Sequence, residues 1–255
     1  MIEQAKVQQA FSNAAGSYNA YAKLQRNVVE TLLSKVPPLL LEAECNVLDV
    51  GCGTGYLSES ITQKNLSWNV TGLDVAYGMC EQHKTYGQTI NGRAERLPLK
   101  NDSFDLVFSS LTFQWITYWS DALNEIKRVL KPGGILVVST LVDGTLKELS
   151  QTFSALDDYQ HVLDFRSADD LKAALSGFEI KNNETIPHQM PYVDLRDLLR
   201  HVKGIGASGK SGNNRKGLLT PRQWQSLEQD YQSNYPKGEG VYATWNVQYV
   251  VVRKA

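Results

Sequence analysis

Three glycines at alternate positions form the most informative chemical feature of the sequence. They stand in the segment VLDVGCGTGYLS (residues 47–58), where an apolar run ending in Asp49 leads into Gly51, Gly53 and Gly55. A strand that runs into a tight glycine turn and then into a helix lets the backbone approach a small ligand closely. The segment therefore predicts a site for a nucleotide-type cofactor.

The spacing of these glycines indicates which kind of cofactor the turn accepts. They read G-x-G-x-G, whereas the dinucleotide fingerprint reads G-x-G-x-x-G and places a pyrophosphate at a helix N-terminus. Asp49, just before the turn, would put negative charge beside such a pyrophosphate. A cofactor with a cationic end therefore suits the turn better than a dinucleotide.

A second acid stands at the tip of the next predicted strand. Residues 70–75 (VTGLDV) end in Asp74 and Val75, and Asp74 follows Gly55 by 19 residues. A carboxylate there can accept two hydrogen bonds from the hydroxyls of a ribose. Asp74 and Val75 are therefore predicted to bind the cofactor beside the glycine turn.

The elements that must position these residues follow from hydrophobic periodicity. Strands after the first two are predicted over residues 89–97, 104–110, 129–138, 178–186 and 242–253. Helices are predicted over residues 6–36 with a break near Gly16, and over 145–157, 168–175, 194–202 and 221–231. Thr220 and Pro221 predict the start of the last helix, as its N-cap and first residue.

The length suits a single domain over residues 1–255. Its N-terminal helices would occupy residues 1–44 and its cofactor-binding core residues 45–141. Residues 187–241, between the last two strands, are predicted to form a helical insertion. Such an insertion tends to cover an active site, so we expect it to determine substrate specificity.

The composition argues against several classes of function. A formal net charge of −1 argues against general nucleic-acid or membrane binding, and no apolar run reaches membrane-spanning length. The N-terminal residues have no apolar signal-peptide core. Cys45, Cys52 and Cys80 lack metal-ligand spacing and suggest the reduced thiols of a cytoplasmic protein, so no metal site is predicted.

Taken together, these segments resemble the class I S-adenosylmethionine-dependent methyltransferases over residues 45–141. VLDVGCGTG resembles the family's first motif, and residues 104–110 (FDLVFSS) resemble the strand after which its active site opens. The resemblance implies S-adenosylmethionine as the cofactor, with Ser110 near it. It also implies an α/β, Rossmann-like fold with a seven-stranded, mostly parallel sheet whose last strand is antiparallel.

One residue departs from this family's pattern. Residues 89–98 (TINGRAERLP) resemble the adenine-contacting segment G-D-A-E-x-L-P, but Arg93 stands in the place of its Asp. In one interpretation the Ala94 backbone and Glu95 recognise the adenine. In the other, Arg93 stacks on the ring or faces away from it.

Positive charge is concentrated in the predicted insertion. From Arg196 to Arg222 there are seven Lys and Arg residues against one acid, Asp197. Arg196 and Arg200 are four residues apart and share one face of a helix, and Lys203 follows three residues later. The charge suggests either a solvated loop face or an anionic substrate or acidic partner, for which these three residues would clamp a carboxylate.

Four segments resemble a narrower family, the malonyl-acyl-carrier-protein O-methyltransferases of biotin synthesis. They are residues 10–26, 109–115, 139–149 and 198–207. The F-x-x-A-A-x-x-Y opening that ends at Tyr18 and the KGIGA segment that begins at Lys203 are the most diagnostic. The resemblance implies methylation of the free carboxyl of a malonyl thioester on acyl-carrier protein, which then primes pimeloyl synthesis.

This reaction would need positioning more than acid–base chemistry. A carboxylic acid with a pKa near about 4 is already ionised at pH 7, so no general base is required. A guanidinium can orient the carboxylate through two parallel hydrogen bonds. Tyr18, Arg200 and Lys203 are the predicted catalytic residues, and the predicted substrate-binding residues are Tyr21, Gln114, Trp115, Phe165, Arg196 and His201.

Two other functions stay open at this point. A quinone- or sterol-type C-methyltransferase would share the glycine turn, although an apolar substrate does not call for an arginine face. A non-catalytic S-adenosylmethionine-binding protein is the other alternative. The intact glycines and Asp74 argue against a loss of cofactor binding.

Overall fold

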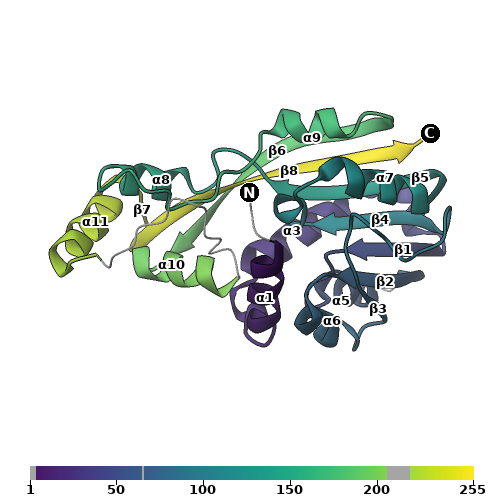
Figure 1. The fold of residues 1–255 in the computed structure, drawn as a ribbon, viewed down its shortest axis with the longest axis horizontal. Helices are drawn as coiled ribbons and strands as arrows, with labels where there is room; N and C mark the ends of the chain where they lie inside the picture. Colours follow the sequence, from purple (N-terminus) through teal and green to yellow (C-terminus); the bar gives the residue numbers. More distant parts are fainter. Residues whose placement is uncertain (1–3, 65, 206–218) are drawn as a thin grey trace.

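A twisted β-sheet runs through the computed structural model, which describes residues 4–64, 66–205 and 219–255 (Figure 1). The strand order is β3-β2-β1-β4-β5-β8-β6, and a two-residue strand, β7, pairs with β8. The strands are β1 (Cys45–Val50), β2 (Trp68–Asp74), β3 (Gln88–Asn91), β4 (Phe104–Ser110), β5 (Leu130–Leu141), β6 (Phe178–Tyr192), β7 (Pro236–Lys237) and β8 (Gly240–Lys254).

The helices surround this sheet and the long β6–β8 ribbon. Figure 1 shows α8, α10 and α11 around the end of the ribbon that extends away from the parallel strands. The helices are α1 (Gln4–Ala14), α2 (Tyr18–Tyr21), α3 (Lys23–Ser34), α4 (Pro38–Leu41), α5 (Tyr56–Gln63), α6 (Tyr77–His83), the 3-10 helix η1 (Phe113–Trp115), α7 (Trp119–Val129), α8 (Lys147–Ser154), α9 (Ala168–Ala174), α10 (Leu195–Gly204) and α11 (Pro221–Asn234).

The pairing confirms the expected fold class. Strands β3, β2, β1, β4 and β5 are parallel, and β8 is antiparallel to both β5 and β6. The chain passes from β1 to β2 on one side, and β4 then pairs with β1 on the other side. In sheets of this kind ligands bind beyond the carboxyl ends of the strands at this reversal of order. The glycine turn lies there.

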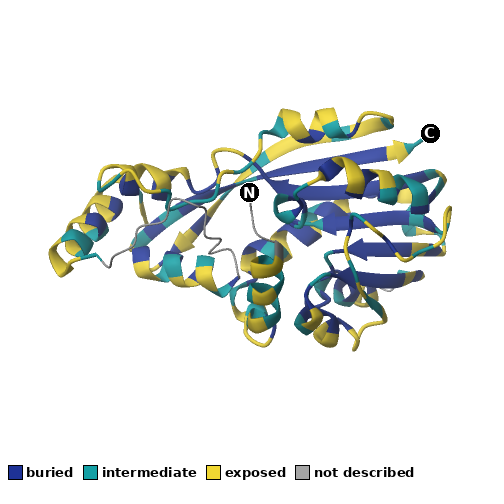
Figure 2. Ribbon diagram, in the orientation of Figure 1, coloured by how far each residue is buried: buried dark blue, intermediate teal, exposed yellow. Residues whose placement is uncertain are grey.

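Apolar side chains on both faces of the sheet hold the central strands in place. Along β1, Val47 belongs to one buried cluster and Leu48 to another, because successive side chains of a strand point to opposite faces. Both residues are fully buried, and Figure 2 shows the central strands as a buried layer beneath helices with exposed outer faces. A strand covered on both faces needs nearly continuous apolar residues, as residues 47–50 almost provide.

Two strands, β3 and β6, differ most in length from the prediction. β3 ends at Asn91 rather than at Leu97, because Gly92 and the charged residues after it offer no alternating apolar face. β6 continues to Tyr192 rather than ending at Ile186. Pro187 and Pro191 are tolerated within β6 because it is an edge strand, where a missing N–H need not break a ladder.

The helix predictions agree in place with the structure. The N-terminal helical stretch breaks around Gly16, which separates α1 from α2. The Thr220 side chain accepts a hydrogen bond from the Gln223 N–H, and Gln223 Oε1 accepts one from the Thr220 N–H, which confirms the predicted start of α11. Among the described residues, no helix is long and apolar enough to cross a membrane.

Candidate active site

The glycine turn between β1 and α5 adopts a backbone that other residues rarely tolerate. Gly51, Gly53 and Gly55 have φ angles of 80°, 53° and 96°. A Cβ on Gly51 would lie 2.0 Å from Thr112 Oγ1, whereas a Cβ on Gly53 would have no atom within 4 Å. Gly51 is therefore needed for packing, and Gly53 leaves backbone open to a ligand. Gly55 caps α5, and its Cβ would lie 2.5 Å from the Tyr86 ring.

Asp74, at the tip of β2, organises the backbone beside this turn. Its Oδ2 accepts a hydrogen bond from the Gly53 N–H at 3.0 Å, and its Oδ1 accepts one from the Ala76 N–H at 2.8 Å. Burial raises the pKa of Asp74, and these backbone donors oppose that shift. The carboxylate therefore connects the ends of β1 and β2 and presents acceptor oxygens at the cavity.

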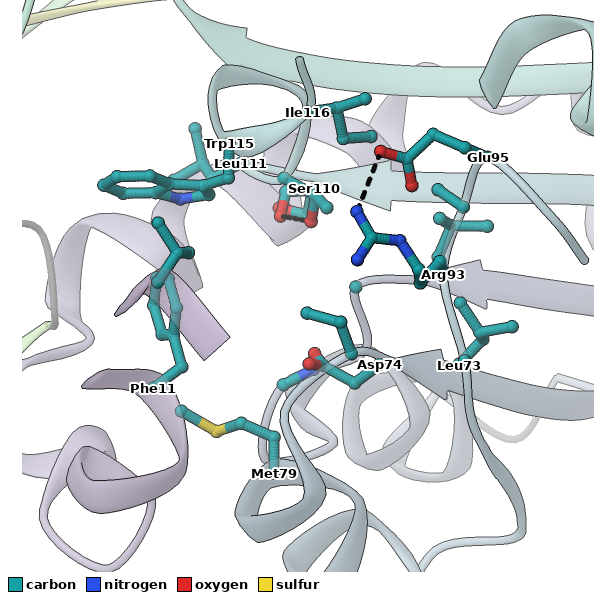
Figure 3. A pocket seen from close by; sticks show the side chains of 18 of the residues that line it. Phe11, Leu73, Asp74, Met79, Arg93, Glu95, Ser110, Leu111, Trp115 and Ile116 are labelled. Atoms are coloured by element: carbon teal, nitrogen blue, oxygen red, sulfur yellow. Dashed lines mark hydrogen bonds and ion pairs between the residues drawn. The ribbon is translucent and has the colours of Figure 1, made fainter. Parts of the chain in front are cut away.

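A cavity opens over these residues at the carboxyl ends of the strands (Figure 3). It contains about 810 Å³ of atom-free space including its open mouth, a size typical of small-molecule sites. Residues that line it and were predicted to bind cofactor are Gly51, Gly53, Asp74, Val75, Arg93, Ala94, Glu95 and Ser110. Tyr18 and Trp115, predicted for catalysis and substrate binding, line it as well.

Arg93 lies on the wall of this cavity. Figure 3 shows its guanidinium pointing inward, toward Glu95, and the two side chains form an ion pair at 3.6 Å. The Arg93 side chain is 49% exposed and that of Glu95 17%. Position 93 thus aims a paired cation at the space above Asp74, where the family's pattern has an Asp.

Asp49 lies behind the turn and does not line the cavity. Only 2% of the residue is exposed, and burial together with the charge of Asp74 raises its pKa to about 8. A carboxyl in this position is largely protonated at neutral pH. Asp49 is therefore a buried, neutral carboxyl behind the turn, whereas the Asp74 carboxylate accepts two backbone hydrogen bonds beside the cavity.

The N-terminal helices roof the cavity. Tyr18 lines it, and Phe11 of α1 packs edge-on against the Trp115 ring at 5.4 Å between centroids. Thr54 in the glycine turn donates a hydrogen bond to Asn19 Oδ1 at 2.6 Å, which fastens α2 to the turn. Burial and the negative charge of Asp74 raise the pKa of Tyr18, so its phenol stays protonated and can donate a hydrogen bond.

Two other predicted substrate residues lie outside the cavity lining. The Gln114 amide donates to the Leu111 carbonyl at 2.7 Å, and its oxygen accepts from Thr140 Oγ1 at 3.1 Å, so it braces the chain after β4. Phe165 packs against the buried cluster on one face of the sheet.

The predicted carboxylate clamp on α10 also lies outside the cavity lining. Arg196 pairs with Glu228 at 3.3 Å and stands over the Trp224 ring, and Arg200 pairs with Asp197 at 3.3 Å. Lys203 is exposed. The other cations of the insertion include Lys210, Arg215 and Lys216, which fall outside the described residues.

His201 and Tyr21 pack together beneath this face of α10. The His201 imidazole is surrounded by the rings of Tyr21, Tyr192 and Trp245, with centroids 5.4–6.5 Å away. Burial lowers the pKa of His201, so the ring is neutral at pH 7. The two residues connect α2 to α10 and do not line the cavity.

Sequence reasoning missed most of the apolar cavity wall. Those residues are Val7, Phe11, Val50, Leu73, Met79, Leu111 and Ile116. In a sequence they look like ordinary core positions. Leu111, immediately after β4, is distinctive in the structure, because its φ of 49° is rare for a bulky residue.

One sequence pattern needs its structural context to be interpreted. Residues 204–211 read GIGASGKS and match the phosphate-binding pattern G-x-x-x-x-G-K-[ST]. A P-loop follows a strand and opens a helix, whereas Gly204 is the last residue of α10. The match therefore lacks the strand that a P-loop requires, and its part from residue 206 onward falls outside the described residues.

The cavity fits S-adenosylmethionine. Open backbone at Gly53 lets the ligand approach closely, the Asp74 carboxylate suits a ribose, and the apolar wall suits an adenine ring. Two acids, Asp74 and Glu95, line the cavity against one base, Arg93, which is paired with Glu95, so the lining favours a cationic ligand over a pyrophosphate. No group of His, Cys, Asp and Glu that would hold a metal ion occurs in the described part of the chain.

Comparisons with known proteins agree with this geometry. A family model described as "Methyltransferase domain" matches residues 48–138. Among solved structures, geranyl diphosphate C-methyltransferase from Streptomyces coelicolor, in complex with S-adenosyl-L-homocysteine, aligns with a TM-score of 0.52 at 15% identity, over 89% of this chain and 78% of that chain. The [4+2]-cyclase SpnF aligns at 0.57 and 21% identity, over 90% and 81%. The fold alone therefore does not define the reaction.

The family model, the Rossmann-like sheet and the cavity, together with the relatives named next, identify the chain as an S-adenosylmethionine-dependent methyltransferase. Malonyl-[acyl-carrier protein] O-methyltransferases from Dechloromonas aromatica and Geobacter sulfurreducens are 33% and 34% identical to the chain. The first alignment covers 98% of this chain and 95% of the relative, and the second covers 100% of each. The chain belongs to the malonyl-[acyl-carrier protein] O-methyltransferase family.

Proposed function

We propose that the protein transfers the methyl group of S-adenosylmethionine to the free carboxylate of a malonyl thioester on acyl-carrier protein. The product is a malonyl methyl ester, which primes pimeloyl synthesis for biotin. The observation that carries the proposal is the extent of the family likeness. It covers nearly the whole chain, including the N-terminal helices and α10, which lie outside the general methyltransferase match at residues 48–138.

The main task of the chain in this reaction is to position the malonyl carboxylate against the methyl group of the cofactor. S-adenosylmethionine supplies an electrophilic methyl group when bound. The malonyl carboxylate is ionised at neutral pH, so its oxygen needs no base before it attacks. Tyr18 can help to position this carboxylate, because its protonated phenol lines the cavity and can donate a hydrogen bond to a carboxylate oxygen. Correct alignment of the reacting groups is worth up to about 7–11 kcal/mol.

Arg200 and Lys203 are the proposed carboxylate-binding residues. The present partner of Arg200 is Asp197 on the same helix, and the Arg200 side chain is 64% exposed. Exposed ion pairs contribute only about 0–1 kcal/mol, so a substrate carboxylate can replace Asp197 at little cost. The Arg196–Glu228 pair on α10 and α11 would stay at the edge of the same surface.

Acyl-carrier protein is the proposed partner, and the cations of α10 and the following segment are its proposed docking surface. A basic surface attracts an acidic carrier and raises the rate of encounter. We place the protein in the cytoplasm. Support for this compartment comes from its three cysteines, which are all free and buried as expected of reduced thiols.

The test is a methyl-transfer assay with malonyl-acyl-carrier protein and S-adenosylmethionine labelled in its methyl group. Label should appear on the carrier and be released by mild base, as expected for an ester. Acetyl-acyl-carrier protein is the matched control, since it lacks the free carboxyl and should take no label. Cofactor binding without turnover of the malonyl substrate, or a base-stable label, would refute the proposal.

A further inference from the structure

Two of the segments that resemble the family, residues 10–26 and 198–207, touch one another at Tyr21 and Gly204. Tyr21 ends α2, and Gly204 ends α10. A Cβ on Gly204 would lie 2.7 Å from both Cγ and Cδ2 of Tyr21 and 3.0 Å from Cδ1. Ordinary contact begins at 3.4 Å, so the Tyr21 ring rests directly on the bare Cα of Gly204.

Tyr21 has little freedom to move away from this contact. The clash would involve Cγ, at the root of the ring, so a rotation of the ring about its own axis does not relieve it. The His201 ring stands perpendicular to the Tyr21 ring, with centroids 6.5 Å apart. His201 in turn packs against Tyr192 and Trp245, which are joined by a hydrogen bond of 3.1 Å. These rings anchor the contact to the β6–β8 ribbon.

The contact joins the cavity wall to the helix that bears the proposed carboxylate-binding cations. Tyr18, three residues before Tyr21 on α2, lines the cavity. Arg200 and Lys203 precede Gly204 on α10, and Figure 1 shows α10 beside the N-terminal helices. The separation between α2 and α10 therefore sets how far the cations lie from Tyr18.

We propose that Gly204 is a positioning residue for methyl transfer. Its missing side chain allows Tyr21 to seat against α10, and this close approach sets the place of Arg200 and Lys203 relative to the cavity. An alanine at position 204 would overlap the Tyr21 ring by about 0.7 Å, the difference between 2.7 and 3.4 Å, so α2 and α10 would have to move apart. The inference rests on the proposed function in naming the malonyl substrate and in the carboxylate-binding role of Arg200 and Lys203.

Gly204→Ala is the direct test, because its backbone tolerates alanine. Gly204 lies in a helix without a positive φ, where alanine is the better helix former, so a purely local role predicts no loss. We expect kcat/KM for malonyl-acyl-carrier protein to fall by about 10²-fold, as for misplacements near 1 Å, with the Kd for S-adenosylmethionine unchanged. Gly16→Ala is the matched control, since a Cβ there has no atom within 4 Å.

Tyr21→Ala supplies the second half of the test. With the Tyr21 ring removed, the added methyl group of Gly204→Ala meets no clash, so Gly204→Ala should cause almost no further loss of kcat/KM in the double variant. Full additivity in the double variant, or a Gly204→Ala enzyme as active as Gly16→Ala, would overturn the proposal.

Hydrogen exchange separates this proposal from the proposed function. Amides of residues 198–205 should exchange faster in Gly204→Ala than in the wild type, with protection restored in the double variant. This measurement needs no substrate. Wild-type protein that fails to methylate malonyl-acyl-carrier protein would refute the proposed function alone, whereas unchanged exchange in Gly204→Ala would refute the positioning role alone.

Discussion

The glycine turn allows loss of cofactor binding to be separated from loss of folding. Gly53→Ala adds one methyl group where no atom lies within 4 Å, on the cavity side of the turn. Gly51→Ala adds the same group 2.0 Å from Thr112 Oγ1, inside packed protein. The two variants are chemically identical changes two residues apart, and the structure predicts opposite phenotypes.

The magnitudes follow from backbone strain and from occupied volume. Both glycines have a positive φ, and placing alanine there costs about 1–2 kcal/mol. Typical folded domains have about 5–15 kcal/mol of stability, so Gly53→Ala should remain folded. Its methyl group takes space that the cofactor needs, and overpacking of this kind costs about 1–3 kcal/mol, or about five- to 160-fold in Kd.

Titration calorimetry with S-adenosylmethionine and a thermal melt of the free protein measure the two quantities. Gly53→Ala should lose affinity, while its melting temperature falls only by the backbone strain of about 1–2 kcal/mol, which is about 2–8 °C for a domain of this size. The melting temperature of Gly51→Ala should fall further than that of Gly53→Ala, because the added methyl group clashes with Thr112 in the folded protein. Wild-type affinity in Gly53→Ala, or equal losses of melting temperature in the two variants, would refute this account of the turn.

Three further substitutions test other parts of the site. Asp74→Asn should weaken S-adenosylmethionine binding in calorimetry, because the single oxygen of the amide cannot accept from both the Gly53 and Ala76 N–H groups. A hydrogen bond of this kind to a charged group is worth about 1.5–3 kcal/mol. An unchanged Kd would contradict this prediction. Asp49 binds its proton up to about pH 8 in the folded protein but only to about its ordinary value of 3.8 when unfolded. Its contribution to stability is therefore full below about pH 4 and is lost as the pH rises toward 8, so wild-type melting temperatures should fall relative to those of Asp49→Asn over that range. Parallel curves would argue against the shift. Arg200→Ala should raise KM or lower kcat for malonyl-acyl-carrier protein far more than it weakens cofactor binding, whereas equal losses would indicate a structural role.

Local sequence was enough to predict the parallel part of the sheet. Short apolar runs flanked by glycine and by acids at their ends mark β1, β2 and β4, since a strand covered on both faces must be apolar throughout. The ends of β3 and β6 could not be predicted in this way. Their lengths depend on where neighbouring strands stop and on which strand lies at the edge, and neither is a property of the segment itself.

For the site, the sequence by itself predicted the cofactor side of the cavity: most of the residues it indicated for cofactor binding line that side, with Asp49 and Gly55 as the exceptions. The Gly53 backbone and the Asp74 carboxylate stand within a few residues of the strand ends that position them, so their spacing along the chain already implies their meeting in space. Only the tertiary structure placed Phe11 and Tyr18 in the roof, turned Arg93 inward, and put Arg200 outside the cavity lining beside Asp197. These positions depend on packing between segments far apart in the chain, where the direction of one side chain is decided by its partners and not by its neighbours in sequence.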